Sequence, residues 1–124
     1  MLQSPDVDGL QRLLWAFAEH RVLTSAASTG ILQYLAEGAA TATEVSQALQ
    51  LAPQPCAKTM RALTALGLLK TEGEHFQIID PLARFFCAGP DDLRPFLTHS
   101  KRMYEGWGEH LESWIRGLGW AHGA

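Results

Sequence analysis

The most regular alternation of apolar and polar positions lies near the C-terminus, between residues 93 and 118. Apolar or small side chains recur there at steps of three and four, the spacing of one face of an α-helix. They are Leu93, Phe96, Leu97, Ser100, Met103, Tyr104, Trp107, Leu111, Trp114, Ile115 and Leu118. At 1.5 Å per residue this helix would measure about 35–40 Å, at least the width of the domain. Part of its apolar face is therefore predicted to contact something other than the chain's own core.

Two glycines interrupt this pattern inside the predicted helix. Gly106 and Gly108 flank Trp107, and each costs about 1 kcal/mol relative to alanine in a helix interior. We therefore expect a bend here, or the close approach of another backbone. Trp107 itself is predicted either to pack in a core or dimer interface or to present its ring to a flat ligand.

The N-terminal third is predicted to form three short helices, over about residues 5–38. Ser4-Pro5 is typical of a helix start. An apolar stripe follows, formed by Leu10, Leu13, Leu14 and Phe17. Residues 24–30 are rich in small side chains, which indicates a second helix packed closely against a neighbour. Residues 31–36 predict a third.

Residues 41–79 carry the signals of a helix, a turn, a second helix and a β-hairpin. Thr41 and Glu44 have the spacing of a capping box, in which each side chain satisfies a backbone donor of the other. Gly67 is placed to end the second helix in a left-handed conformation. Residues 68–79 read as two short strands around a Gly-Glu turn. This order predicts a winged helix.

The predicted fold class is therefore mainly α, a winged-helix-like domain with a short β-hairpin and a long C-terminal helix. We expect a single domain over residues 1–124, with the helix-turn-helix and wing at 41–79 and C-terminal helices at 81–117. Asp80-Pro81 is predicted to cap and start the first of these helices, and Asp91 or Asp92 to cap the last.

Composition narrows the classes of function. The 124 residues are 47% apolar and 19% charged, with a net charge of −3 and a pI near 5.9. This acidic balance counts against nucleic acid as a partner. No apolar run approaches the roughly 20 residues of a membrane span, and the N-terminus does not resemble a signal peptide. The two cysteines are expected to be reduced and buried, so the chain is predicted to be cytoplasmic.

Candidate chemistry is sparse. The histidines are His20, His75, His99, His110 and His122, which we expect to be surface or partner-facing residues, with no metal site. The glycine pairs at 106/108 and 117/119 lack the strand and helix that a cofactor loop requires, so no cofactor site is predicted. A DNA reader would use the outward residues of the second helix of the unit, namely Gln54, Lys58, Arg61 and Thr64. The acidic wing, Glu72-Gly73-Glu74, would repel phosphate.

The run ALTALGLLKTEGEHFQIIDPLARFF, followed by LRPFLTHSKRMYEGWGEHLESWIRG, resembles the N-terminal dimerisation domain of class I S-adenosylmethionine-dependent O-methyltransferases. These are the plant caffeic-acid type and its bacterial relatives in pigment and polyketide tailoring. The segment ASTGILQYLAEGAATATEVSQALQL fits the same pattern, so the resemblance covers nearly the whole chain.

The resemblance implies a winged helix that has lost DNA binding and intertwines with its copy in a homodimer. It also implies that the last helices form one wall of the pocket for an aromatic or polyketide-like acceptor. The residues matching that wall are Met103, Trp107, Phe96 and His99. The family's Rossmann-like catalytic domain, with its S-adenosylmethionine loop and histidine base, is absent from these 124 residues. The resemblance therefore assigns no catalytic or cofactor-binding residue here.

The sequence thus predicts a dimerisation and acceptor-pocket-forming domain of an O-methyltransferase-type protein, not catalytic alone. The chain would then be a fragment, one half of a split system or a free-standing relative. Two alternatives remain: a winged-helix DNA-binding transcriptional regulator, or a free-standing module that binds a small molecule or a partner.

Overall fold

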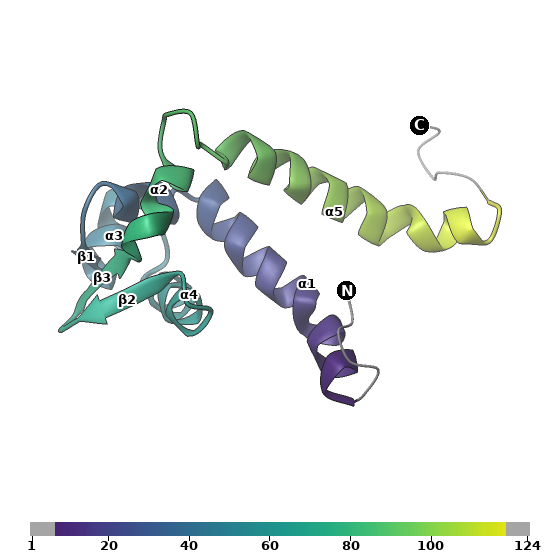
Figure 1. Cartoon of the computed structure of the whole chain (residues 1–124), viewed down its shortest axis with the longest axis horizontal. Coiled ribbons are helices and arrows are strands. Elements are labelled where there is room, and N and C mark those ends of the chain that lie inside the picture. The colour runs from purple at the N-terminus through teal and green to yellow at the C-terminus, as the bar shows by residue number, and fades with distance from the viewer. Residues whose placement is uncertain (1–6, 119–124) are drawn as a thin grey trace.

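Two long helices, α1 and α5, project from a smaller body of short helices and strands (Figure 1). The computed structural model describes residues 7–118. The elements in chain order are α1 (Val7–Ser28), α2 (Ile31–Ala36), β1 (Ala40–Thr41), α3 (Ala42–Leu49), α4 (Pro53–Ala65), β2 (Leu69–Glu72), β3 (His75–Ile78), the 3-10 helix η1 (Asp80–Phe86) and α5 (Arg94–Ile115). The predicted class, mainly α with a short hairpin and a long last helix, is confirmed.

The winged-helix unit is formed by α3, α4 and the β2–β3 hairpin. Its sheet has the antiparallel order β1-β3-β2, with Leu69 opposite Ile78 and Ala40 opposite Phe76. Strand β1 was not predicted, because two residues are too few to show an alternating pattern. It adds a third strand on the far side of β3 and ties the start of α3 to the wing.

The predicted helix signals within this unit are confirmed. The Thr41 hydroxyl accepts a hydrogen bond from the Glu44 backbone N–H at 3.1 Å, and the Glu44 carboxylate accepts one from the Thr41 N–H at 2.9 Å. Gly67 follows α4 with a φ of +88°, a left-handed conformation that costs glycine little. These local bonds fix where α3 begins and where the chain turns from α4 into the wing.

The N-terminal prediction of three helices is wrong. Residues 7–28 form one continuous helix, α1, and only α2 follows before the winged-helix unit. The small-residue segment contains no proline or glycine before residue 30, and its alanines favour helix, so nothing ends α1 there. Thr24 and Ala26 are buried where α1 meets the body. The predicted start at Ser4-Pro5 lies outside the described residues.

The connection into α5 also differs from the prediction. Asp80 lies within a 3-10 helix whose N-cap position is Ile79, so Asp80 is not a cap. Helix α5 begins at Arg94, and its N-cap position is Leu93 rather than an aspartate. Asp92 nevertheless accepts a hydrogen bond from the Arg94 backbone N–H at 2.9 Å, and its carboxylate pairs with the Arg94 guanidinium at 2.8 Å. Helix α5 ends at Ile115, two residues before the predicted limit.

Helix α5 runs through both internal glycines without a break. A Cβ atom at Gly106 or Gly108 would meet nothing within 4 Å. No other described part of this chain therefore brings its backbone close to these glycines. Such an approach was one of the two expectations for them.

The core lies in the body, away from the parts of α1 and α5 that project from it. Its buried side chains are Ala26, Ile31, Leu32, Leu35, Ala40, Val45, Cys56, Met60, Leu63, Leu69, Ile78, Phe86 and Leu97. Cys56 is buried as expected, which raises the pKa of its thiol, and Cys87 is only half-buried. The side chain of α5 that joins this core is Leu97, near the helix start.

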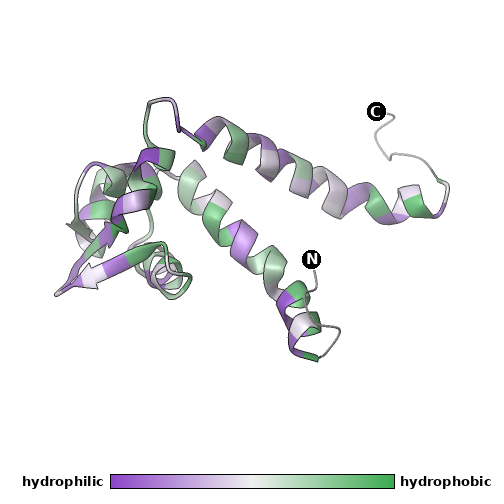
Figure 2. Cartoon of the chain, viewed as in Figure 1, coloured by the Kyte–Doolittle hydropathy of each residue, from purple (hydrophilic) through white to green (hydrophobic). Residues whose placement is uncertain are grey.

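Much of the remaining apolar surface lies on α1 and α5, where green segments continue along both helices beyond the body (Figure 2). Exposed large apolar side chains on these two helices are Val7, Leu10, Leu13, Leu14, Trp15, Phe17, Phe96, Met103, Trp107, Trp114 and Ile115. No helix in the range 7–118 is long and apolar enough to cross a bilayer.

Candidate functional site

The C-terminal half of α1 and the first half of α5 meet through polar side chains. His20 Nε2 lies 2.7 Å from Ser100 Oγ, although the two residues are 80 positions apart in the chain. One turn further along α5, the Glu105 carboxylate is 3.3 Å from both the Arg21 guanidinium and the Lys101 ammonium. Hydrogen bonds from Lys101 and Arg21 lower the pKa of Glu105. These contacts join the C-terminal half of α1 to α5.

Aromatic stacking reinforces this crossing. The rings of His20 and Tyr104 are 5.3 Å apart and inclined by 30°. The Arg21 guanidinium lies 5.6 Å from the centre of the same tyrosine ring, within the range of a cation–π contact. Tyr104 thus contacts both His20 and Arg21 of α1.

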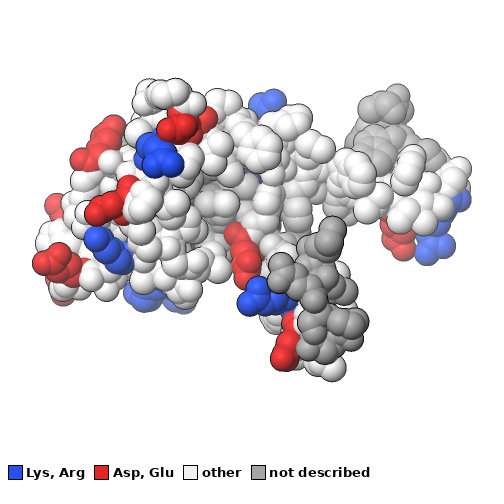
Figure 3. Space-filling view, in the orientation of Figure 1, with Lys and Arg blue, Asp and Glu red and all other residues white. Residues whose placement is uncertain are grey.

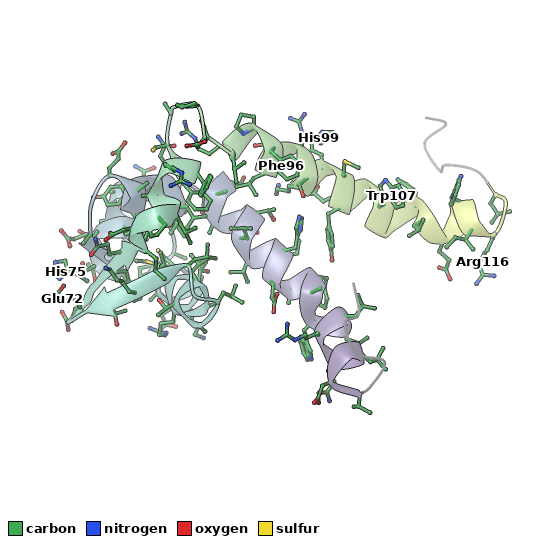
Figure 4. All side chains as sticks on the ribbon, viewed as in Figure 1. Glu72, His75, Phe96, His99, Trp107 and Arg116 are labelled. Atoms are coloured by element: carbon green, nitrogen blue, oxygen red, sulfur yellow. The ribbon has the colours of Figure 1, made fainter. Side chains whose placement is uncertain are left out.

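A cavity of about 280 Å³ lies beside this crossing; we call it the α1–α5 groove. It is lined by His20, Phe96, His99, Ser100, Met103, Tyr104 and Trp107. The structure therefore brings together all four residues that the resemblance marked as a pocket wall. Figure 4 shows three of these along α5: Phe96 and His99 lie close together near its start, and Trp107 lies further along the helix. Whether they bind a ligand remains a prediction.

The groove combines an open apolar wall with one polar end. Phe96 is 64% exposed, Trp107 51% and Met103 47%, which is high for large apolar side chains. His20 is half-buried, and its Nδ1 atom has no hydrogen-bond partner among the described residues. An apolar cavity with a few placed polar groups is the usual form of a small-molecule site.

Sequence reasoning missed His20 as a groove residue. His20 lies on a different helix, and its position relative to the stripe of α5 depends on how the helices cross. Ser100 and Tyr104 were identified only as members of that stripe. No local pattern connects residue 20 with residue 100, so the sequence offered no signal for this pair.

The other histidines are dispersed. His75 and His99 are exposed as expected, whereas His110 is only 5% exposed, so its predicted surface position is wrong. His110 follows Trp107 by three residues, which places it on the same face of α5. His122 lies outside the described residues. Among residues 7–118 no group of three or more His, Cys, Asp or Glu side chains could hold a metal ion.

A second hollow, of about 250 Å³, lies at the wing and is lined by Ala39, Glu72, His75 and Gln77. Glu72 and His75 mark the two sides of the hairpin turn (Figure 4). His75 is also 3.9 Å from the Glu44 carboxylate, whose pKa is lowered chiefly by the backbone hydrogen bond from Thr41. The hollow has few apolar lining residues, so it offers little to an aromatic ligand.

The surface that a DNA reader would use is weakly basic. Gln54, Lys58 and Arg61 are exposed on α4, but Thr64 is half-buried and donates to the Met60 carbonyl at 2.9 Å. On the face drawn in Figure 3, acidic and basic side chains are interspersed over the body. This face shows no continuous basic surface of the kind that follows a phosphate backbone.

Comparison with known proteins gives a family match. Residues 11–89, more than half of the chain, match the model of the O-methyltransferase dimerisation domain. Among curated proteins, the N,N-dimethyltransferase OxyT of Streptomyces rimosus is 29% identical over 100 residues. That alignment covers 79% of this chain and 29% of OxyT.

Solved structures share the fold. The structure titled "PigF with SAH" matches with a TM-score of 0.82 and 17% identity, over 90% of this chain and 34% of PigF. An O-methyltransferase family protein from Burkholderia thailandensis matches with a TM-score of 0.76 and 23% identity, over 88% of this chain and 33% of that protein. The chain thus spans about a third of the length of these relatives.

Proposed function

Because the chain belongs to the O-methyltransferase dimerisation domain family, we propose that it forms a homodimer through α1 and α5 and supplies one wall of an acceptor pocket. In the proposed whole protein, a catalytic part outside these 124 residues binds S-adenosylmethionine. The acceptor that receives the methyl group is an aromatic or polyketide-like molecule. The residues described here hold the acceptor and the second copy, and they carry out no chemical step.

The observation that carries the dimer is the apolar stripe of α1. Val7, Leu10, Leu13, Leu14 and Phe17 recur at steps of three and four, and each is at least half exposed. Monomeric proteins rarely expose contiguous apolar patches beyond a few hundred Å². A stripe on a helix that projects from its own core favours burial against another copy, as the family description indicates.

Sedimentation equilibrium tests the homodimer directly. We expect a species of about 27 kDa at micromolar concentration, twice the 13.6 kDa of one chain. A mass of one chain throughout that concentration range would overturn the dimer.

The acceptor wall is supported by the α1–α5 groove. Phe96, Met103 and Trp107 line the groove while keeping about half or more of their surface open, so a flat ring could cover them. Aromatic and thioether side chains favour such contacts.

Methionine methyl NMR tests the wall in the intact chain. Met103 lines the groove, whereas Met60 is fully buried in the core and serves as an internal control. Naphthalene, a flat two-ring probe, should shift the Met103 methyl resonance in a saturable way and leave Met60 unchanged. An unchanged Met103 resonance would overturn the acceptor wall without affecting the dimer.

A further inference from the structure

We infer that His20 and Ser100 form a hydrogen-bonding pair that selects aromatic ligands carrying an acceptor oxygen, such as a ketone or a phenolate. The inference deepens the proposed function, because it rests on the α1–α5 groove being the acceptor site. It adds one residue from α1 and one from α5, and it specifies which chemical group the ligand presents to them.

The position of the His20 proton follows from its surroundings. A neutral imidazole carries a proton on one ring nitrogen and a lone pair on the other. Nδ1 is buried and has no partner among the described residues, so a proton there would be a buried N–H without an acceptor. Nε2, in contrast, lies 2.7 Å from Ser100 Oγ. The geometry therefore favours an Nε2–H that donates to the serine oxygen.

This assignment leaves the hydroxyl proton of Ser100 unused. Several helical threonines donate their hydroxyl proton to the carbonyl four residues earlier, as Thr98 does to Arg94 at 3.1 Å. Within the described part of the chain, Ser100 has no such bond, and its hydrogen bond is the one with His20. Because Ser100 lines the groove, its free hydroxyl proton is available to a ligand there.

The rest of the groove limits what that ligand can be. Phe96, Met103 and Trp107 present ring faces and a thioether, which suit a flat aromatic body. Tyr104 stacks on His20 and fixes the imidazole in place. A ligand lying on the apolar wall with an oxygen toward Ser100 would accept the unused proton, while His20 acts as the positioning residue of the serine.

The test compares two flat two-ring probes of similar size, chromone and naphthalene. Chromone carries a ketone oxygen and naphthalene has no polar group. Both are titrated into the full chain, and the Met103 methyl resonance reports binding with Met60 as the internal control. We expect chromone to bind roughly two- to tenfold more tightly, the ratio that one neutral hydrogen bond supplies.

Four variants separate the hydrogen bond from the shape of the groove. Ser100→Ala should bring the two dissociation constants together by weakening chromone and leaving naphthalene unchanged. His20→Phe keeps a ring against Tyr104 but loses the Nε2–H that positions the Ser100 hydroxyl. It should therefore also remove the preference for chromone. His20→Gln keeps an N–H near the position of Nε2 and should restore part of it. The matched control is Thr98→Ala, because Thr98 is exposed on α5 and outside the groove; it should keep the wild-type preference.

Each possible result decides the inference. Equal affinity for the two probes in the wild-type chain, or a chromone preference that survives Ser100→Ala, would overturn the His20–Ser100 pair while the acceptor wall stands. Loss of the preference in Thr98→Ala as well would show a nonspecific effect and would also overturn it. If neither probe shifts Met103, for example because a second copy fills the groove, the acceptor wall and the pair both fail.

Discussion

Leu14→Asp is the substitution that most directly tests the proposed dimer face. Leu14 lies in the middle of the α1 stripe and is 61% exposed within one chain. The substitution leaves the core of the body untouched, because the buried residues of α1 are Thr24 and Ala26. It should therefore weaken association and leave the fold of the chain intact.

The size of the effect follows from the exposed fraction. Burying a whole leucine side chain contributes about 1.5–3 kcal/mol, so the 61% still exposed would contribute about 0.9–1.8 kcal/mol on association. A two-fold symmetric dimer uses the same residue twice, which doubles this to about 1.8–3.6 kcal/mol. The dissociation constant should rise by roughly 20- to 400-fold, since about 1.4 kcal/mol is a factor of ten. Burial of the introduced carboxylate would add to this.

Sedimentation equilibrium over a range of chain concentrations measures this shift. The matched control is Leu66→Asp, which makes the same change at a leucine that is 39% exposed at the end of α4. Leu66→Asp should dimerise like the wild type. Far-ultraviolet circular dichroism should show that both variants keep their helices.

Equal dimerisation of Leu14→Asp and the wild type would refute the reasoning, because a buried aspartate pair cannot leave an apolar interface unchanged. Weakening by both aspartate variants alike would also refute it, since the loss would then not depend on the α1 stripe.

Three further predictions concern stability and cofactor binding. Trp107→Ala should lower the melting temperature by less than about 8 °C, because Trp107 is 51% exposed. Leu32→Ala in the core, in contrast, should lower the free energy of unfolding by about 2–5 kcal/mol. A larger drop in melting temperature for Trp107→Ala would contradict the proposal that Trp107 lines an acceptor groove. The carboxyl pKa of Glu44 is lowered in the folded chain, so the stability it contributes is present above its ordinary value of 4.5 and is lost as the pH falls through the lower folded value. Glu44→Gln should therefore flatten the acid side of the pH dependence of urea unfolding, and an unchanged profile would argue against the capping box as its source. Calorimetric titration of the chain with S-adenosylmethionine should give no saturable heat, because the sequence has no glycine-rich loop between a strand and a helix; micromolar binding would disprove this.

Local sequence signals predicted the winged-helix unit well. The Thr41–Glu44 capping box, the left-handed Gly67 and the hairpin were all placed correctly, since each depends on bonds between residues close in the chain. The errors in the N-terminal helices arose where the signal was weak. The small residues at 24–28 include alanines that favour helix, so α1 continues through them to Ser28.

The family resemblance identified the wall of the candidate groove, and helical spacing agrees with it. Phe96, His99, Met103 and Trp107 lie along one helix, so their common position follows from steps of three and four alone. The resemblance supplied the reason to single them out. The structure then placed all four around one cavity, which spacing by itself could not establish.

The sequence by itself therefore determined the winged-helix elements, the Thr41–Glu44 capping box, the left-handed turn at Gly67 and the apolar excess of the two long helices, because these depend on neighbours within a few residues. Only the tertiary structure decided that α1 crosses α5 at His20 and Ser100, residues 80 positions apart. A contact of that separation depends on the packing of the intervening body, which sets the angle between the helices. The polar end of the groove therefore depends on the tertiary structure, because it needs His20 from α1 beside Ser100 from α5.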